Sequence, residues 1–196
     1  MLVDFSVELG RDDPALELPW TSDDPAIRYL DLKNHPELLP EIPEAVAHPE
    51  LAAFLARISA PEFPLATAKC DAWATSEILP EEEIFGGECK FASYVDLVFV
   101  DRVARLAFKR HEELAQQLCK LLKHAPEIAA AIEFLIRRCY FHQDGPASSE
   151  DSESGFYLTM YINAFGNTHE EARKQWTIAL ALAQHALVQV AGRLAT

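Results

Sequence analysis

The sequence lacks the motifs that identify most common enzyme classes. It contains no GxxxxGK[ST] phosphate-binding loop, no GxGxxG dinucleotide fingerprint and no GxSxG nucleophile elbow. Two segments, HEELAQQ and HEEARKQ, begin like the HExxH zinc-protease motif but lack its second histidine. We therefore predict no cofactor and no metal ion, and whether the chain is an enzyme stays open at this stage.

Cysteine pairs and long apolar runs are also missing. Cys70, Cys89, Cys119 and Cys139 form no CxxC pair, which favours free, buried thiols. No uninterrupted apolar run reaches the roughly 18 residues that a membrane helix needs. The first residues, MLVDFSVELGRDD, lack the basic and apolar regions of a signal peptide. We expect a cytoplasmic protein without a membrane anchor.

Basic residues are scarce. The 196 residues include 31 Asp and Glu against 17 Lys and Arg, a net charge of −14, and residues 1–64 hold 13 of these acids and only 4 basic side chains. A negative field of this size repels phosphate groups, so we expect neither nucleic acid nor a membrane as a partner. The simplest consequence of the charge is solubility.

Residues 1–64 combine prolines with large apolar side chains. Eight of the 12 prolines lie between Pro14 and Pro61, which prevents a helix through most of this segment. Side chains such as Phe5 and Trp20 are too large and apolar for a solvated tail. We predict an irregular, acidic arm packed on a main domain formed by residues 65–196, with one short helix at about residues 49–58.

The remaining residues predict an α+β fold. Alternating apolar and polar side chains indicate strands at 67–78, 91–100, 132–142 and 155–165, and helical spacing indicates helices at 101–123 and 168–193. This order, strand-strand-helix twice, predicts a four-stranded antiparallel sheet from two ββα units, with both helices on one face and the arm on the other. The echo of HEEL in HEEA supports an internal repeat.

Two local alternatives remain open from the pattern. Arg110 and His111 interrupt the apolar stripe of the first helix, so this helix begins either at an Asp101 cap or near Arg110. The third strand has two possible phases. The side chains that project to the sheet face opposite the helices are either Arg137 and Cys139, or Arg138, Tyr140 and His142. The second helix has a capping box, since Thr168 is followed three residues later by Glu171.

The strand faces opposite the helices carry an unusual mixture of aromatic and charged side chains. The candidate ligand-binding residues are Lys69, Asp71, Trp73, Tyr94, Asp96, Tyr157, Tyr161 and Asn163. Apolar area with a few oriented polar groups is typical of a binding site. The same side chains also stabilise a sheet without a ligand, and the arm needs a surface to cover. Both interpretations hold if the arm covers half of this face and leaves a groove along its edge.

The first hypothesis is a non-enzymatic binding or interaction protein that uses this open face. An acidic face with tyrosines favours a small polar or cationic ligand, or a basic protein segment, and a homodimer is compatible with it. The alternative is a small hydrolase in which Asp71 and Asp96 act as paired carboxylates with separated pKa values.

Three weaker candidates lie outside this set. The segment from Gln143 to Ser154 predicts a hairpin loop, although Glu150, Asp151 and Glu153 could supply oxygen ligands to a cation. Cys139 and His142, three positions apart, suggest a metal ligand pair or a nucleophile, and Cys70 beside Asp71 suggests a nucleophile. A buried thiol is the simpler interpretation of each cysteine.

Overall fold

A six-stranded mixed sheet forms the centre of the molecule. The computed structural model describes residues 1–24, 27–142 and 152–194. The strands are β1 (Leu2–Glu8), β2 (Ala15–Leu18), β3 (Leu65–Thr75), β4 (Cys89–Phe99), β5 (Ala130–His142) and β6 (Ser152–Gly166). Their order is β1-β5-β6-β4-β3, and β2 also pairs with β5. The strand β3 therefore lies at one edge of the sheet.

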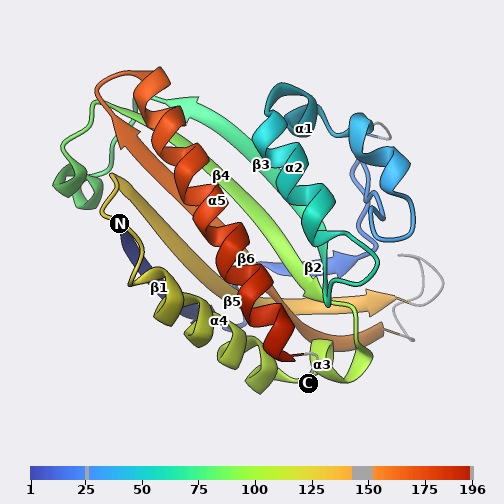
Figure 1. Cartoon of the computed structure of the whole chain (residues 1–196). Helices are drawn as coiled ribbons and strands as arrows, with labels where there is room; N and C mark the ends of the chain where they lie inside the picture. Colours follow the sequence, from blue (N-terminus) through green and yellow to red (C-terminus); the bar gives the residue numbers. More distant parts are fainter. Residues whose placement is uncertain (25–26, 143–151, 195–196) are drawn as a thin grey trace.

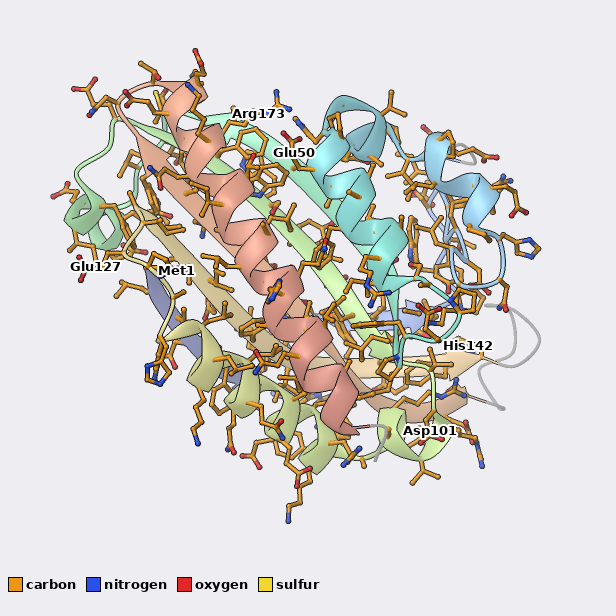
Figure 2. The ribbon with its side chains drawn as sticks, in the orientation of Figure 1. Met1, Glu50, Asp101, Glu127, His142 and Arg173 are labelled. Atoms are coloured by element: carbon orange, nitrogen blue, oxygen red, sulfur yellow. The ribbon has the colours of Figure 1, made fainter. Side chains whose placement is uncertain are left out.

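Three longer helices cover one face of this sheet, with α5 between α4 and α2 (Figure 1). The helices are α1 (Pro43–Ala47), α2 (Pro49–Ile58), α3 (Arg102–Leu106), α4 (Phe108–Leu122) and α5 (His169–Leu194), and two 3-10 helices are η1 (Pro36–Glu41) and η2 (Pro80–Phe85). Glu50 of α2 and Arg173 of α5 form an ion pair of 3.3 Å between neighbouring helices (Figure 2). No helix in the described ranges is long and apolar enough to cross a membrane.

The predicted order of elements after residue 64 is confirmed. Two strands and a helical segment are followed by two strands and α5, and all four of these strands pair antiparallel. The cap of α5 is also confirmed: Thr168 Oγ1 accepts from the Glu171 amide at 3.2 Å. The Glu171 side chain reaches back to the amide of Asn167. Whether the two halves arose by duplication stays a prediction.

The predicted helix at 101–123 is divided in two. Asp101 caps α3, since its Oδ1 accepts from the Ala104 amide at 2.8 Å. Extended backbone at Ala107 then separates α3 from α4. Both alternatives of the sequence pattern are thus partly right, because one short helix starts at the cap and a longer one starts near Arg110.

The prediction of four antiparallel strands is wrong, because the N-terminal segment adds two strands in parallel. In β1, residues from Leu2 to Glu8 pair with 131–137, and β2 pairs with 138–141 of the same strand β5. The segment is therefore not the irregular arm that its prolines suggest. A parallel pairing between residues more than 120 positions apart leaves no local pattern in the sequence.

The arm also reaches both faces of the sheet, instead of only the face without long helices. Four side chains of α2 are buried in the main core between sheet and helices: Leu51, Phe54, Leu55 and Ile58. On the opposite face, Leu16 is buried in a second cluster, against which Leu18 and Trp20 pack. Parts of the N-terminal segment thus pack on both faces of the sheet, while β1 extends the sheet at the side opposite β3.

Strand pairing shows which side chains of β5 and β3 face the helices and which face away from them. Arg137 pairs with Tyr157, so Arg137 and Cys139 face away from the helices, as the first of the two alternatives had it. In β3 the register shifts between Thr67 and Cys70. This bulge puts Thr67 on the helix side, where its hydroxyl meets that of Ser59 at 3.2 Å. The expected single alternation from Thr67 to Thr75 is therefore wrong before Cys70.

Candidate functional site

Cross-strand pairing places most of the predicted site residues on one face. Asp71 pairs with Tyr94, and Tyr94 with Tyr161. In the adjacent row Trp73 pairs with Ala92, which pairs in turn with Asn163. Paired residues project to the same side of a sheet, so these side chains share the face that the long helices leave uncovered.

The arm covers one half of this face and leaves the other half open. The second cluster forms the covered half; its buried members are Leu16, Ala66, Ala68, Val98, Cys139, Phe141 and Tyr157. Trp20 is tied to it by a hydrogen bond of 2.9 Å from its indole to the carbonyl of Ala68. Tyr157 therefore belongs to the covered half, with 4% of its surface exposed, whereas Trp73 of the open half is 40% exposed.

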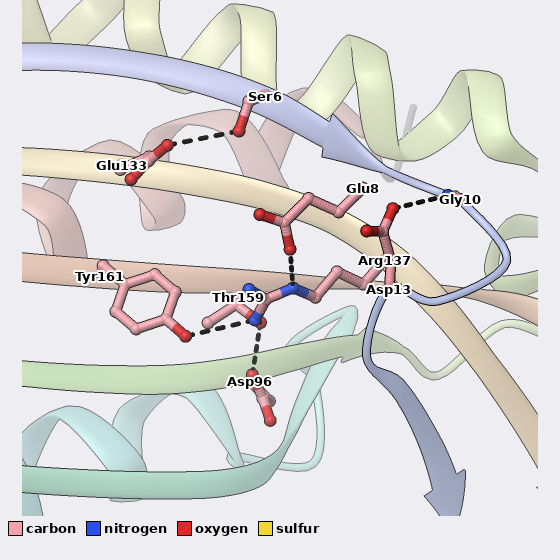
Figure 3. A network of polar contacts seen from close by, with 9 residues as sticks. All are labelled: Ser6, Glu8, Gly10, Asp13, Asp96, Glu133, Arg137, Thr159 and Tyr161. Atoms are coloured by element: carbon pink, nitrogen blue, oxygen red, sulfur yellow. Dashed lines mark hydrogen bonds and ion pairs between the residues drawn. The ribbon is translucent and has the colours of Figure 1, made fainter.

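A polar network runs between the two halves (Figure 3). The guanidinium of Arg137 donates to Glu8 at 2.7 Å, to the Tyr161 hydroxyl at 3.2 Å and to Thr159 at 3.4 Å. The Thr159 hydroxyl donates in turn to Asp96 Oδ1 at 2.6 Å. Glu8 was not among the predicted site residues, because no local pattern in the proline-rich arm indicates that Glu8 lies beside β5.

Asp96 is a buried acid within this network. Only 5% of its surface is exposed, and this burial raises its pKa from 3.8 to about 6, although the bond from Thr159 and the charges of Lys69 and Arg137 lower it. Burial likewise raises the pKa of Tyr157 to about 12. Asp96 therefore changes its charge close to neutral pH, whereas Tyr157 stays protonated.

Asp71 and Asp96 occupy neighbouring rows of the sheet. Asp71 lies opposite Tyr94 and accepts a hydrogen bond from the Ala72 amide at 2.7 Å. Asp96 lies opposite Thr159 on one side, and the bulged part of β3 lies on its other side. Lys69 belongs to this bulge, and its ammonium lies 4.8 Å from the centre of the Trp20 ring.

A groove of about 480 Å³ runs along the boundary between arm and sheet. Its lining residues are Trp20, Thr21, Ser22, Asp23, Ile27, Lys69, Cys70 and Tyr94. Two predicted site residues, Lys69 and Tyr94, thus meet arm residues that the sequence did not connect with them. The groove opens beside the row of Asp71, Tyr94 and Tyr161.

The two cysteine candidates do not form reactive centres among the described residues, and the cation loop is described only in part. Burial raises the pKa of the Cys70 thiol to about 12 and also raises that of Cys139, which disfavours a thiolate nucleophile in either place. Glu150 and Asp151 of the proposed cation loop lie outside the described residues. Glu153 accepts hydrogen bonds from Arg102 and Arg105. His142 lies against Glu17.

Comparison with known proteins gives no relative: no protein family, no curated protein and no solved structure matches this chain.

Proposed function

We propose that the chain is a non-enzymatic binding protein whose open sheet face and adjoining groove take a cationic group. The observation that carries the proposal is the row formed by Asp71, Tyr94 and Tyr161, which is half-buried and lies next to a groove of about 480 Å³. The group would belong to a small polar molecule or to a basic segment of a partner protein.

The chemistry of the open half favours a cation over an anion. Aromatic faces attract ammonium and guanidinium groups, and carboxylates nearby add to this attraction. The rings of Tyr94 and Tyr161 lie 5.8 Å apart beside Asp71, and the guanidinium of Arg137 already lies 5.7 Å from the centre of the Tyr161 ring. Arg137 is already engaged by Glu8, and Lys69 lies beside the Trp20 ring where it lines the groove. Asp71 is therefore the acid of the open half that would attract a positive ligand.

A small hydrolase is a second candidate, and the pKa of Asp96 favours it. A carboxyl group that titrates at about 6 is suited to general acid or base chemistry near neutral pH. In this case Asp96 would exchange the proton, and Asp71, one row away, would be the second carboxylate.

Titration with two probes tests the binding proposal. Tetramethylammonium represents a small cationic ligand and a lysine hexapeptide represents a basic segment, and both are followed by amide chemical shifts in NMR spectra. We expect shifts that saturate around Asp71, Tyr94 and Tyr161 with at least one probe. Trp73→Ala and Asp71→Asn should each weaken that affinity by about threefold to tenfold, since the first removes an exposed aromatic ring and the second a half-buried charge of the same face.

Two control variants match these changes elsewhere on the surface. Val103→Ala removes an exposed apolar side chain, and Glu127→Gln removes an exposed charge, and neither residue belongs to the sheet face. Affinity should be unchanged in both. If acetate perturbs the open face more strongly than the two cations, or if neither cation binds, the proposal is wrong.

A further inference from the structure

A second cavity, of about 230 Å³, lies where the two hydrophobic clusters meet around the edge strand β3. Leu32 and Leu55 reach it from the main core, and Trp20 and Ala68 reach it from the second cluster. Half-buried Leu30 and Ile42 complete its apolar wall. An engineered apolar cavity of about 150 Å³ is known to admit benzene, so this volume is sufficient for a small apolar group.

The bulge in β3 shapes one side of this cavity. The register shift between Thr67 and Cys70 displaces the strand, and the four residues from Thr67 to Cys70 all line the space. Bulges of this kind are common beside functional sites. The Thr67 hydroxyl already bonds to Ser59, so this part of the wall favours apolar contact with an occupant.

Four charged side chains line the same cavity, and two of them neutralise each other. Arg28 and Glu41 form an ion pair of 3.3 Å. Lys69 and Glu44 form no ion pair within the described residues. They flank Cys70: Lys69 precedes it in the chain, and Glu44 is close enough to act electrostatically on its thiol. One positive and one negative group are thus available beside an apolar space.

We propose that this cavity binds a small zwitterion with an apolar side chain, such as a free apolar amino acid. The side chain would occupy the space between Leu30, Ile42 and Leu55. The carboxylate of the ligand would meet Lys69, and its ammonium would meet Glu44. A simple carboxylate or a simple amine would satisfy only one of these two charges, and it would approach the other charge unfavourably.

This second site is independent of the proposed binding of cations on the open face. The cavity shares part of its wall with the groove, but neither Tyr94 nor Asp71 lines it. Tyr94→Ala should therefore weaken the cation site and leave the amino-acid site intact. If cations bind but amino acids do not, only the cavity proposal is wrong. If amino acids bind but cations do not, only the proposal for the open face is wrong.

Calorimetric titration and thermal denaturation with a set of amino acids test the proposal. L-Leucine and L-phenylalanine should bind and raise the melting temperature, because a ligand that binds only the folded state stabilises it. N-Acetyl-L-phenylalanine lacks the ammonium, and L-phenylalaninamide lacks the carboxylate. Each should bind about tenfold more weakly, the effect of losing one charge-assisted contact, and glycine should not bind.

Variants that fill the cavity or remove its charges complete the test. Ile42→Phe should abolish binding, whereas Leu39→Phe is the matched control, since Leu39 packs on the main core but does not line the cavity. Lys69→Gln removes the partner of the carboxylate, so L-phenylalanine and its amide should then bind equally. Glu44→Gln removes the partner of the ammonium, so L-phenylalanine and its N-acetyl form should then bind equally. If Ile42→Phe fails to fold, Leu30→Phe serves the same purpose.

Three results would overturn this inference. They are the absence of binding by both L-leucine and L-phenylalanine, undiminished binding by the folded cavity-filling variant, and equal binding of the blocked and unblocked ligands.

Discussion

At the scale of single residues, Asp96 is an acid that the fold places where a neutral side chain would be more stable. The residue is 5% exposed, and its carboxyl group accepts a hydrogen bond from Thr159. Desolvation outweighs that bond and the charges of Lys69 and Arg137, so the pKa rises instead of falling. A buried carboxyl group with a raised pKa is a candidate for a role in binding or chemistry.

Asp96→Asn should stabilise the protein above about pH 7 and have little effect near pH 4. The folded pKa of about 6 exceeds the unfolded value of 3.8, so between these values the native state holds a proton that the unfolded state has released. The stability contributed by that proton is complete below the unfolded pKa and is lost as the pH rises through the folded one. The gain should be on the order of 1–3 kcal/mol in urea denaturation.

Asp71→Asn is the matched control, because Asp71 is a half-buried acid on the same face. Its free energy of unfolding should differ little from that of the wild type at both pH values. A variant Asp96→Asn that is less stable than the wild type at about pH 8 would show that Asp96 is stabilised by its neighbours rather than destabilised by burial.

At the scale of elements, the contact between α3 and β6 depends on a glycine. A Cβ atom at Gly155 would lie 2.5 Å from the carbonyl oxygen of Arg105 and 2.9 Å from the ring of Phe141. The short helix α3 can cross the strand this closely only because position 155 has no side chain. The break at Ala107 separates α3 from α4, which packs with the other helices.

Gly155→Ala should therefore lower the free energy of unfolding by roughly 1–3 kcal/mol, the usual effect of forcing an extra group into a packed contact. The loss is measured by urea denaturation. NMR shifts should concentrate in α3 and at the end of β5. Ser154→Ala, at the exposed neighbouring position, should have an effect close to zero. Equal stability of the two variants would mean that α3 moves away freely and contributes little to the fold.

At the scale of the whole molecule, the first 64 residues and the remainder share one core. Val3 of β1 and Phe54 of α2 are buried in the same cluster as Phe134 and Trp176. The parallel pairing of β1 and β2 also covers one entire edge of β5. The arm is thus an integral part of the core and of the sheet.

A fragment of residues 65–196 should consequently fail to unfold cooperatively. It would lose the buried side chains of Val3, Leu51, Phe54 and Ile58, each worth about 1.5–3 kcal/mol. Their sum is comparable to the whole stability of a typical domain, about 5–15 kcal/mol. Circular dichroism during heating measures the transition, and adding residues 1–64 as a separate peptide should restore it. A sharp transition of the fragment alone would show that residues 65–196 form an independent domain.

The sequence pattern was most informative where the structure is local. The strands around Tyr94 and Tyr161 and the helix after Thr168 follow from alternation, helical spacing and capping, each of which involves residues only a few positions apart. The same alternation placed Asp71, Trp73, Tyr94 and Tyr161 together. It erred at Thr67, because a bulge inserts one residue and reverses the sides of the strand.

By itself, the sequence determined the α+β class of the fold, the order of strands and helices after residue 64, and the mixture of aromatic and charged side chains on one sheet face. Only the tertiary structure decided that β1 and β2 join β5, that the arm covers half of this face, and that a groove and a cavity remain beside β3. The physical reason is the range of the interactions. Spacing along a chain records which side of an element is apolar, whereas the partner that covers that side is selected by packing among distant segments.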